Sequence, residues 1–171
     1  MTLATDQLDT RAARADVYRV AHAALVVGGL RVGGGMAGLL VSLLAGAEAR
    51  AAGIGAAFGL GASVIGLVSN NRWSFYEHPP VETLATVDTR RAVLVEAIRR
   101  ALLPSTAGVA VFLLVSLAIE PILSAALAGI LGGLGAVGLA SCAGIFVWER
   151  RERLHLYADL SRPPQRYGAP R

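Results

Sequence analysis

The chain has 171 residues, of which 54% are hydrophobic and only 16% are charged, and its formal net charge is +4. Four runs contain no charged residue, and they cover residues 32–47, 51–71, 101–119 and 121–148. About 20 apolar residues are needed to cross a bilayer, and a soluble chain of this length has too little interior to bury four such runs. The composition therefore predicts an integral membrane protein rather than a soluble domain.

The basic residues are all arginines, and they flank the apolar runs without forming a separate basic domain. This placement favours an anionic membrane surface as the partner, and no nucleic acid is expected. The single cysteine, Cys142, excludes an intramolecular disulfide, and we expect a small buried side chain there. Residues 1–19 carry several charges and lack the short apolar core of a cleavable signal, so we expect the N-terminus to be retained.

The first repeat unit is predicted over residues 9–80, after a disordered leader at residues 1–8. Residues 9–27 are rich in Ala and Arg and favour a helix. This helix either extends the first membrane span at its cytoplasmic end or lies in the membrane plane. The first span is expected at about 28–47, and the second at about 51–70 after a tight reversal.

Arg31 is the one charged residue that lies inside an apolar region. With a first span ending at residue 47, it would lie roughly 6 Å inside the cytoplasmic edge. We expect its side chain to reach the lipid headgroups. The alternative is a role in an ion pathway or in docking a partner.

The second repeat unit is predicted over residues 81–164. It begins with an amphipathic helix at about 83–101, followed by spans at about 104–120 and 122–148. A cytoplasmic helix is expected at 149–160, and residues 165–171 should form a loose tail. Three aromatic residues lie where side chains favour the membrane interface, and we expect them to act as anchors: Trp73, Tyr76 and Trp148.

An internal duplication relates the two units. Adding 74 to each number from Gly34 to Gly61 gives the second copy, Gly108 to Gly135, and the pattern LLVSL recurs in register. Each copy turns back on itself near its middle. The fold class predicted is an all-α integral membrane protein, with four transmembrane helices arranged as two tandem helical hairpins and flanking cytoplasmic amphipathic helices.

Arginines lie before the first span, between the two hairpins and after the last span, whereas the two short reversals hold only Arg50 beside Glu48 and Glu120. Positive residues remain on the cytoplasmic side of an inner or plasma membrane. Both termini are therefore expected in the cytoplasm. Both copies then insert the same way, as a parallel repeat with a pseudo-twofold axis along the membrane normal.

Small residues spaced four apart predict close helix contacts. Their positions are Gly34, Gly38, Gly55, Gly59, Gly129 and Gly133. These contacts lie either within the chain or at a face for self-association. The matched serines Ser42 and Ser116 either line a narrow polar path or bond to their own helix backbone.

No motif in the sequence indicates catalysis, a metal site or a cofactor. His22, His78 and His155 lie far apart, and no carboxylate lies deep in a span. We therefore expect a non-enzymatic membrane protein that acts by association, as an accessory or scaffold subunit or as a homo-oligomer. One alternative is a small channel or transporter lined by Arg31, Ser42 and Ser116, and another is a membrane-shaping hairpin protein. The copies differ where the first has Arg31 and the second has Pro104-Ser105. If the protein has a functional site within the membrane, it is expected there.

Overall fold

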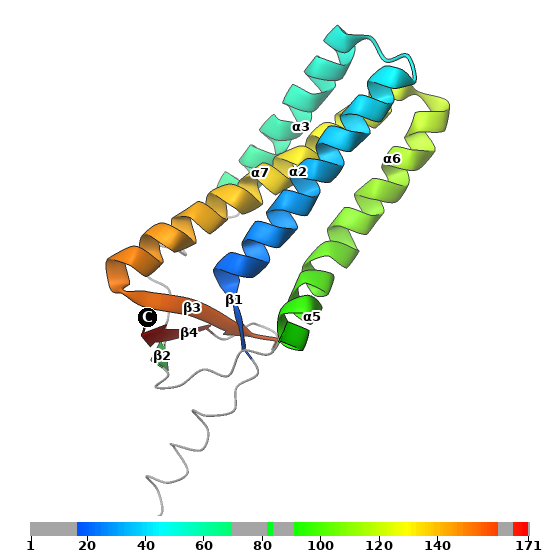
Figure 1. The fold of residues 1–171 in the computed structure, drawn as a ribbon. Coiled ribbons are helices and arrows are strands. Elements are labelled where there is room, and N and C mark those ends of the chain that lie inside the picture. Colours follow the sequence, from blue (N-terminus) through cyan, green and yellow to red (C-terminus); the bar gives the residue numbers. More distant parts are fainter. Residues whose placement is uncertain (1–16, 70–81, 84–90, 161–165, 171) are drawn as a thin grey trace, which may run out of the picture.

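The computed structural model describes residues 17–69, 82–83, 91–160 and 166–170, and this part of the chain is mostly helical (Figure 1). Four strands gather at one end of the helices, which we call the sheet end, and two helix reversals lie at the opposite turn end. The helices are α2 (Val20–Leu44), α3 (Ala49–Ser69), α5 (Arg91–Leu102), α6 (Gly108–Ile119) and α7 (Pro121–Glu152). The strands are β1 (Val17–Arg19), β2 (Glu82–Thr83), β3 (Leu154–Asp159) and β4 (Arg166–Pro170).

Two of these helices, α2 with 25 residues and α7 with 32, are long and apolar enough to cross a membrane. Helix α2 is continuous from Val20, so residues 20–27 extend the predicted first span instead of forming a separate helix. Residues 17–19 are a strand, and residues 9–16 lie outside the described part of the chain. The apolar run of α2 therefore carries the helix about two turns further toward the sheet end than the span predicted at 28–47.

The first reversal is built on Gly46, which has a φ of +101°. The amide of Ala47 donates to the carbonyl of Ser42 at 3.0 Å, and the amide of Gly46 donates to Leu43 at 3.1 Å. This pair of bonds is the Schellman motif, whose left-handed residue is usually glycine. Helix α2 consequently ends at Leu44, three residues before the predicted end of the first span at residue 47.

The second reversal depends on Glu120 and Pro121. Glu120 is extended, with φ −150° and ψ 104°, and Pro121 occupies the first turn of α7. Proline is suited to this position because its missing N–H would have no partner inside the helix. The reversal lies where the sequence predicts it, and α7 begins one residue before the predicted span at 122–148.

A π-helical turn, η1 (Leu103–Ala107), joins α5 directly to α6. The third span is predicted to begin at about Pro104, but the helix itself does not begin there. Pro104 lies inside a continuous helical segment, where its missing N–H interrupts the regular hydrogen-bond ladder. Such an interruption is commonly accommodated by a wider turn.

The four strands form one small sheet in the order β1-β3-β4-β2. Strand β3 pairs antiparallel with β1 and with β4, and β2 pairs parallel with β4. Three predictions are corrected here. The helix expected at 149–160 is replaced after Glu152 by β3, and Thr83 lies in a strand instead of starting a helix. Residues 166–170 form β4 instead of a loose tail. In β3 the buried side chains alternate, at Leu156 and Ala158, as in a sheet with one covered face.

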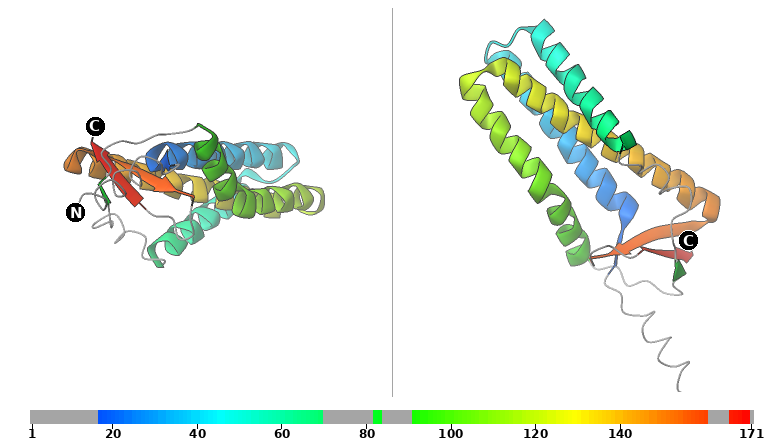
Figure 2. Two further views of the ribbon diagram at one scale, coloured as in Figure 1. Left: turned by 90° about the horizontal axis from the view of Figure 1, so that it is seen from below. Right: turned by 180° about the vertical axis from the view of Figure 1, so that it is seen from behind.

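Helix α7 is the central element of the helical part and runs between α2 and α3 (Figure 2). It packs most extensively against α2, next against α3, and over a smaller surface against α6. Among the described residues, α6 makes no comparable contact with α3. A full pseudo-twofold would pair α6 with α3 as it pairs α2 with α7. The packing is therefore less symmetric than the duplicated sequence predicts.

Small residues lie inside the helix contacts and large apolar residues lie outside. The buried positions of α2 and α7 are dominated by Gly, Ala and Ser. Outside, Leu44 is 80% exposed, Phe58 is 72% exposed and Met36 is 68% exposed. This distribution is the opposite of that in a water-soluble bundle, whose large apolar side chains are the ones most often buried.

Candidate functional site

The side chain of Arg31 joins the first repeat to the segment around η1. Its Nε donates to Oγ1 of Thr106 at 2.9 Å, and its Nη2 donates to the backbone carbonyl of Ala101 at 2.9 Å. The π-helical turn that contains Pro104 begins two residues after Ala101. The two places where the duplicated copies differ, Arg31 and the Pro104-Ser105 segment, therefore belong to one local arrangement.

Three helices meet at a buried serine pair near the turn end. Oγ of Ser42 lies 2.8 Å from the carbonyl oxygen of Gly38 and 2.9 Å from Oγ of Ser124. Ser124 Oγ also lies 3.5 Å from the carbonyl oxygen of Leu113 on α6. The hydroxyl of Ser42 thus bonds its own helix, as one of the two sequence interpretations expected, and also connects α2 to α7.

Ser116, the matched serine of the second repeat, is 4% exposed. Its hydroxyl donates to the carbonyl of Leu113 in its own helix at 3.0 Å. Ser116 and Ser42 are therefore both buried, and each has a backbone carbonyl as a partner. Ser124 was not singled out from the sequence because it has no serine counterpart in the first repeat, where residue 50 is an arginine.

The most buried charged residue described is Glu149, which is 0% exposed at the sheet end of α7. Arg19 Nη2 donates to its Oε2 at 2.7 Å, and the amide of Leu156 donates to its Oε1 at 3.0 Å. Nδ1 of His155 lies 3.3 Å from Oε2. A guanidinium and a backbone N–H both favour the ionised carboxylate, so this buried charge is compensated.

The chain reaches this arrangement through Arg153, which ends α7 in the left-handed conformation with φ 56°. The reversal of direction there returns β3 to Glu149 and places the Leu156 amide against the carboxylate. Sequence reasoning missed Glu149, Arg19 and the contact of His155. The Arg19–Glu149 pair spans 130 residues, and no local pattern marks a carboxylate beside two arginines as buried.

Two other residues singled out from the sequence lie beside this cluster. Trp148 is partly buried against the core formed by Ala21, Cys142, Ile145 and Leu156. Cys142 is 2% exposed, and its Sγ lies 3.3 Å from the carbonyl oxygen of Ala21. Of the three predicted anchors, Trp148 therefore packs on protein near the sheet end, and Trp73 and Tyr76 lie outside the described residues.

The predicted packing glycines lie at close approaches between helices. A Cβ atom added at Gly55 would lie 3.1 Å from the amide nitrogen of Ala126, and one added at Gly59 would lie 2.6 Å from the carbonyl carbon of Gly129. One added at Gly133 would lie 2.8 Å from Oγ of Ser63. The duplicated glycine pairs of α3 and α7 thus pack in the same helix interface.

The predicted packing glycines of α2 also lie close to other helices. A Cβ at Gly38 would lie 2.7 Å from Cδ1 of Leu113 and 3.2 Å from Cβ of Ala128, whereas one at Gly34 would lie 3.2 Å from Cδ2 of Leu131. Gly35, which the spacing pattern did not single out, lies still closer to α7. A Cβ there would lie 2.6 Å from the amide nitrogen of Gly132.

An apolar cavity of about 240 Å³ lies between α2 and α3 over the middle of α7. Its lining includes Met36, Leu39, Ala56, Leu60 and Gly132. None of the lining residues is polar. The cavity is therefore suited to contact with lipid or with another apolar helix.

The electrostatics of α5 are set by Glu96, which accepts hydrogen bonds from Arg99 at 2.7 Å and from Arg100 at 2.8 Å. The bond from Arg99, followed by that from Arg100, lowers the pKa of Glu96 to about 2. Arg100 also donates to the carbonyl of Leu160 at 3.0 Å, which connects α5 to the end of β3. This face of the sheet end therefore remains ionised across the neutral pH range.

Within the described residues, no group of three His, Cys, Asp or Glu side chains is arranged to hold a metal ion. Several of the polar contacts described above connect one helix or strand to another, such as those of Arg31, Ser42 and Glu149. Comparisons of the chain with protein-family models, with curated proteins and with solved structures found no match.

Proposed function

We propose that this chain is a multi-pass membrane protein that acts by association, as an accessory or scaffold subunit of a membrane complex or as a homo-oligomer. The proposal includes four membrane spans, with α3 and α6 joining α2 and α7 in the bilayer and with α5 at the cytoplasmic end. It also places both termini in the cytoplasm.

The distribution of apolar side chains supports insertion into a bilayer. Large exposed residues cover all four helical segments, for example Leu44 on α2, Phe58 on α3, Phe112 on α6 and Val147 on α7, with exposed fractions from 67% to 80%. A soluble monomer rarely exposes such extensive apolar surface. In lipid these side chains are solvated, while the small residues inside allow close helix contacts.

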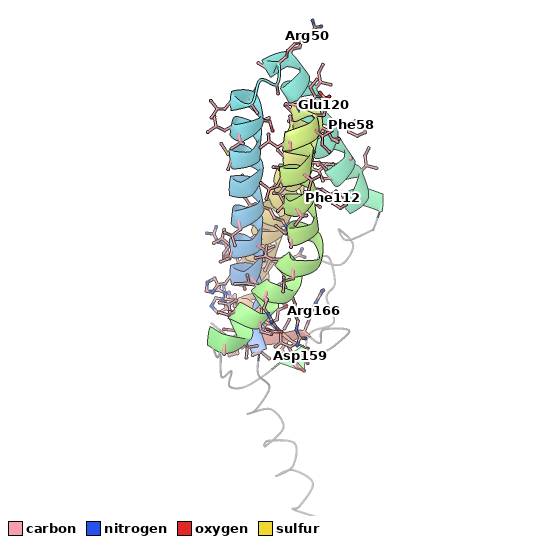
Figure 3. The ribbon with its side chains drawn as sticks, turned by 90° about the vertical axis from the view of Figure 1, so that its right-hand side faces the viewer. Arg50, Phe58, Phe112, Glu120, Asp159 and Arg166 are labelled. Atoms are coloured by element: carbon pink, nitrogen blue, oxygen red, sulfur yellow. The ribbon has the colours of Figure 1, made fainter. Side chains whose placement is uncertain are left out.

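The arrangement of charges supports the proposed orientation. In Figure 3, Arg50 and Glu120 lie at the turn end, and Asp159 and Arg166 lie at the sheet end. Arginines are numerous in the described elements at the sheet end: Arg19, Arg99, Arg100, Arg150, Arg151, Arg153 and Arg166. Because cytoplasmic segments carry the excess of Arg, this distribution supports a cytoplasmic sheet end.

The observation that carries the association proposal is a set of open glycines on the outer helix faces. A Cβ atom added at Gly29 or Gly33 of α2, or at Gly53 or Gly61 of α3, would meet nothing within 4 Å. These pairs are spaced by four and eight residues, so each pair lies on one helix face. Small residues on a lipid-facing helix surface permit close approach of another helix.

Gentle affinity purification in mild detergent tests this proposal. We expect a particle larger than one 17.7 kDa chain, or a co-purifying membrane protein. Leucines at Gly29 and Gly33, or at Gly53 and Gly61, should weaken at least one such association without disturbing the fold. Gly144→Leu is the matched control because Gly144 is also open. A strictly monomeric particle without a partner would contradict the proposal.

A second candidate, a small channel or transporter, is favoured by Arg31. Thirteen residues separate Arg31 from the end of α2 at Leu44, or about 20 Å of helix. Arg31 would then lie about 10 Å inside a 30 Å hydrocarbon layer, and an ionisable residue at that depth often marks a transport path. Liposome flux that is abolished by Arg31→Ala and reduced by Ser42→Ala with Ser116→Ala would support this candidate.

A further inference from the structure

Helix α7 has two covered faces, and its counterpart α3 has one. Through Gly129 and Gly133, α7 packs on α3, and through Ala128, Gly132 and Gly135 it packs on α2. Subtracting 74 from the second set gives the corresponding positions of α3, which are Ile54, Phe58 and Gly61. Ile54 is 64% exposed, Phe58 is 72% exposed, and a Cβ at Gly61 would meet nothing within 4 Å. The face of α3 that corresponds to a helix-binding face of α7 is therefore uncovered.

Helix α6 shows the complementary difference. Its counterpart α2 contacts α7 through Gly35 and Gly38, whose corresponding positions in α6 are Val109 and Phe112. Phe112 is 69% exposed, while α6 packs within the chain through the buried residues Leu113 and Ser116. The contact that corresponds to α2–α7 would join α6 to α3, and it does not form within one copy.

The α2–α7 contact and its counterpart differ in the size of their side chains and in their connections. At the α2–α7 interface the facing positions are glycines and Ala128, so the backbones approach closely. At the corresponding positions, Ile54, Phe58 and Phe112 are large, so the helices of a contact between them would lie further apart. The Glu120-Pro121 reversal at the same time keeps α6 against α7.

We propose that a second copy of this chain covers the face, with α6 of each copy packed on α3 of the other. All copies insert with the same orientation, so two reciprocal contacts form a closed dimer whose twofold axis follows the membrane normal. Phe58 is 72% exposed and Phe112 is 69% exposed, so both side chains remain available to a second copy. This inference rests on the proposed function, because it requires a membrane-spanning chain that acts by association.

The duplication also predicts which residues meet. A Cβ at Gly38 would lie 3.2 Å from Cβ of Ala128 within one chain, and the corresponding pair is Phe112 of one copy with Ile54 of the other. Likewise, Gly35 with Gly132 corresponds to Val109 with Phe58. Gly61 has no side chain, and a Cβ atom there would meet nothing within 4 Å. This position therefore leaves room beside Phe58 for a large side chain of the second copy.

Cysteine cross-linking between two differently tagged copies tests the pairing. Both copies carry Cys142→Ala, and one adds Ile54→Cys while the other adds Phe112→Cys. After co-expression and oxidation in membranes, we expect a disulfide-linked species that carries both tags. The matched control replaces Ile54→Cys with Leu40→Cys, because Leu40 is 58% exposed and lies on α2. This control should not cross-link to Phe112→Cys.

A second measurement follows the dimer without cysteines. Phe58→Ala combined with Phe112→Ala should lower the dimer association constant at least about tenfold, as expected when buried aromatic anchors are removed. Met36→Ala combined with Leu40→Ala, on the exposed face of α2, should leave it unchanged. An equal loss in both double variants would overturn the proposed interface.

The outcomes separate this inference from the proposed function. An oligomer or a foreign complex that forms without the Ile54–Phe112 cross-link overturns the inference and leaves association standing. A Leu40 cross-link as strong as that of Ile54 overturns it in favour of the α2 face. A strict monomer with no partner overturns both proposals.

Discussion

Nη2 of Arg19 lies 2.7 Å from Oε2 of Glu149, although 130 residues separate them in the chain. The pair connects the strand before α2 to the last turn of α7, and the Leu156 amide adds β3 to the same carboxylate. The carboxylate of Glu149 in α7 therefore contacts both β1 and β3. This contact fixes the sheet end relative to the helices.

Replacing Glu149 should destabilise the protein more than replacing any exposed carboxylate nearby. Glu149→Ala leaves the Arg19 guanidinium without its buried partner, and loss of one member of such a pair costs about 3 kcal/mol. Thermal unfolding in detergent would measure the loss. Glu152→Ala is the control, since its 3.7 Å contact with Arg151 is exposed and should contribute less than about 1 kcal/mol. Equal effects of the two substitutions would argue against the buried pair.

Gly35, at a close approach of α2 to α7, should not tolerate a methyl group. Gly35→Ala places Cβ 2.7 Å from the carbonyl oxygen of Ala128, which is backbone and cannot move alone. We expect the free energy of unfolding to fall by about 1–3 kcal/mol, as it does when a methyl group is forced into other well-packed cores. Gly144→Ala, on an open face of α7, should be neutral or stabilising because alanine favours helices. A neutral Gly35→Ala would show that the two helices are further apart.

The two matched serines should differ in their contributions. Ser42→Ala removes both the bond within α2 and the 2.9 Å contact with Ser124 on α7, so we expect a loss of about 1 kcal/mol. Ser116→Ala removes only a bond within its own helix and should cost less. Unfolding of the two variants and the wild type in one detergent would measure the difference. A larger loss for Ser116→Ala would contradict the assigned contacts.

Arg31 should stabilise the segment around η1. Arg31→Ala frees the carbonyl of Ala101 and the hydroxyl of Thr106 from the guanidinium. Amide hydrogen exchange over residues 101–107 should then become faster, because the π-helical turn already has an irregular hydrogen-bond ladder. Arg50→Ala, at the turn end, provides a control of equal charge change. Unchanged exchange in Arg31→Ala would show that this side chain does not stabilise the turn.

The sequence predicts the helical part of the fold well because apolar runs and turn residues act locally. The run from Val32 to Ala47 and the Glu120-Pro121 pair indicate a long apolar helix and a reversal close to where the structure has them. The exact end of α2 depends on the Schellman bonds at Gly46, and nothing in the sequence distinguishes this glycine from those that precede it in α2. The π-helical turn was missed because Pro104 is equally compatible with the first turn of a new helix.

Prediction from the sequence fails at the sheet end because its contacts join residues that are far apart in the chain. Strands β1 and β2 have three and two residues, too few for a periodic pattern. Strand β3 does alternate, but Ala, Leu and Arg around it also favour a continued helix. Glu149 is buried only because Arg19 and Leu156 converge on it, and neither contact has a local signature. By contrast, the difference between Arg31 and the Pro104 segment was visible in the duplication, and the structure brings these two features together.

The most direct test of the account is the mass of the native particle, measured after extraction of the tagged chain into lipid nanodiscs together with identification of all proteins present. Association predicts at least two copies of the 17.7 kDa chain in one particle, or one copy with a stoichiometric membrane partner. A homogeneous particle that holds a single chain and nothing else would contradict it.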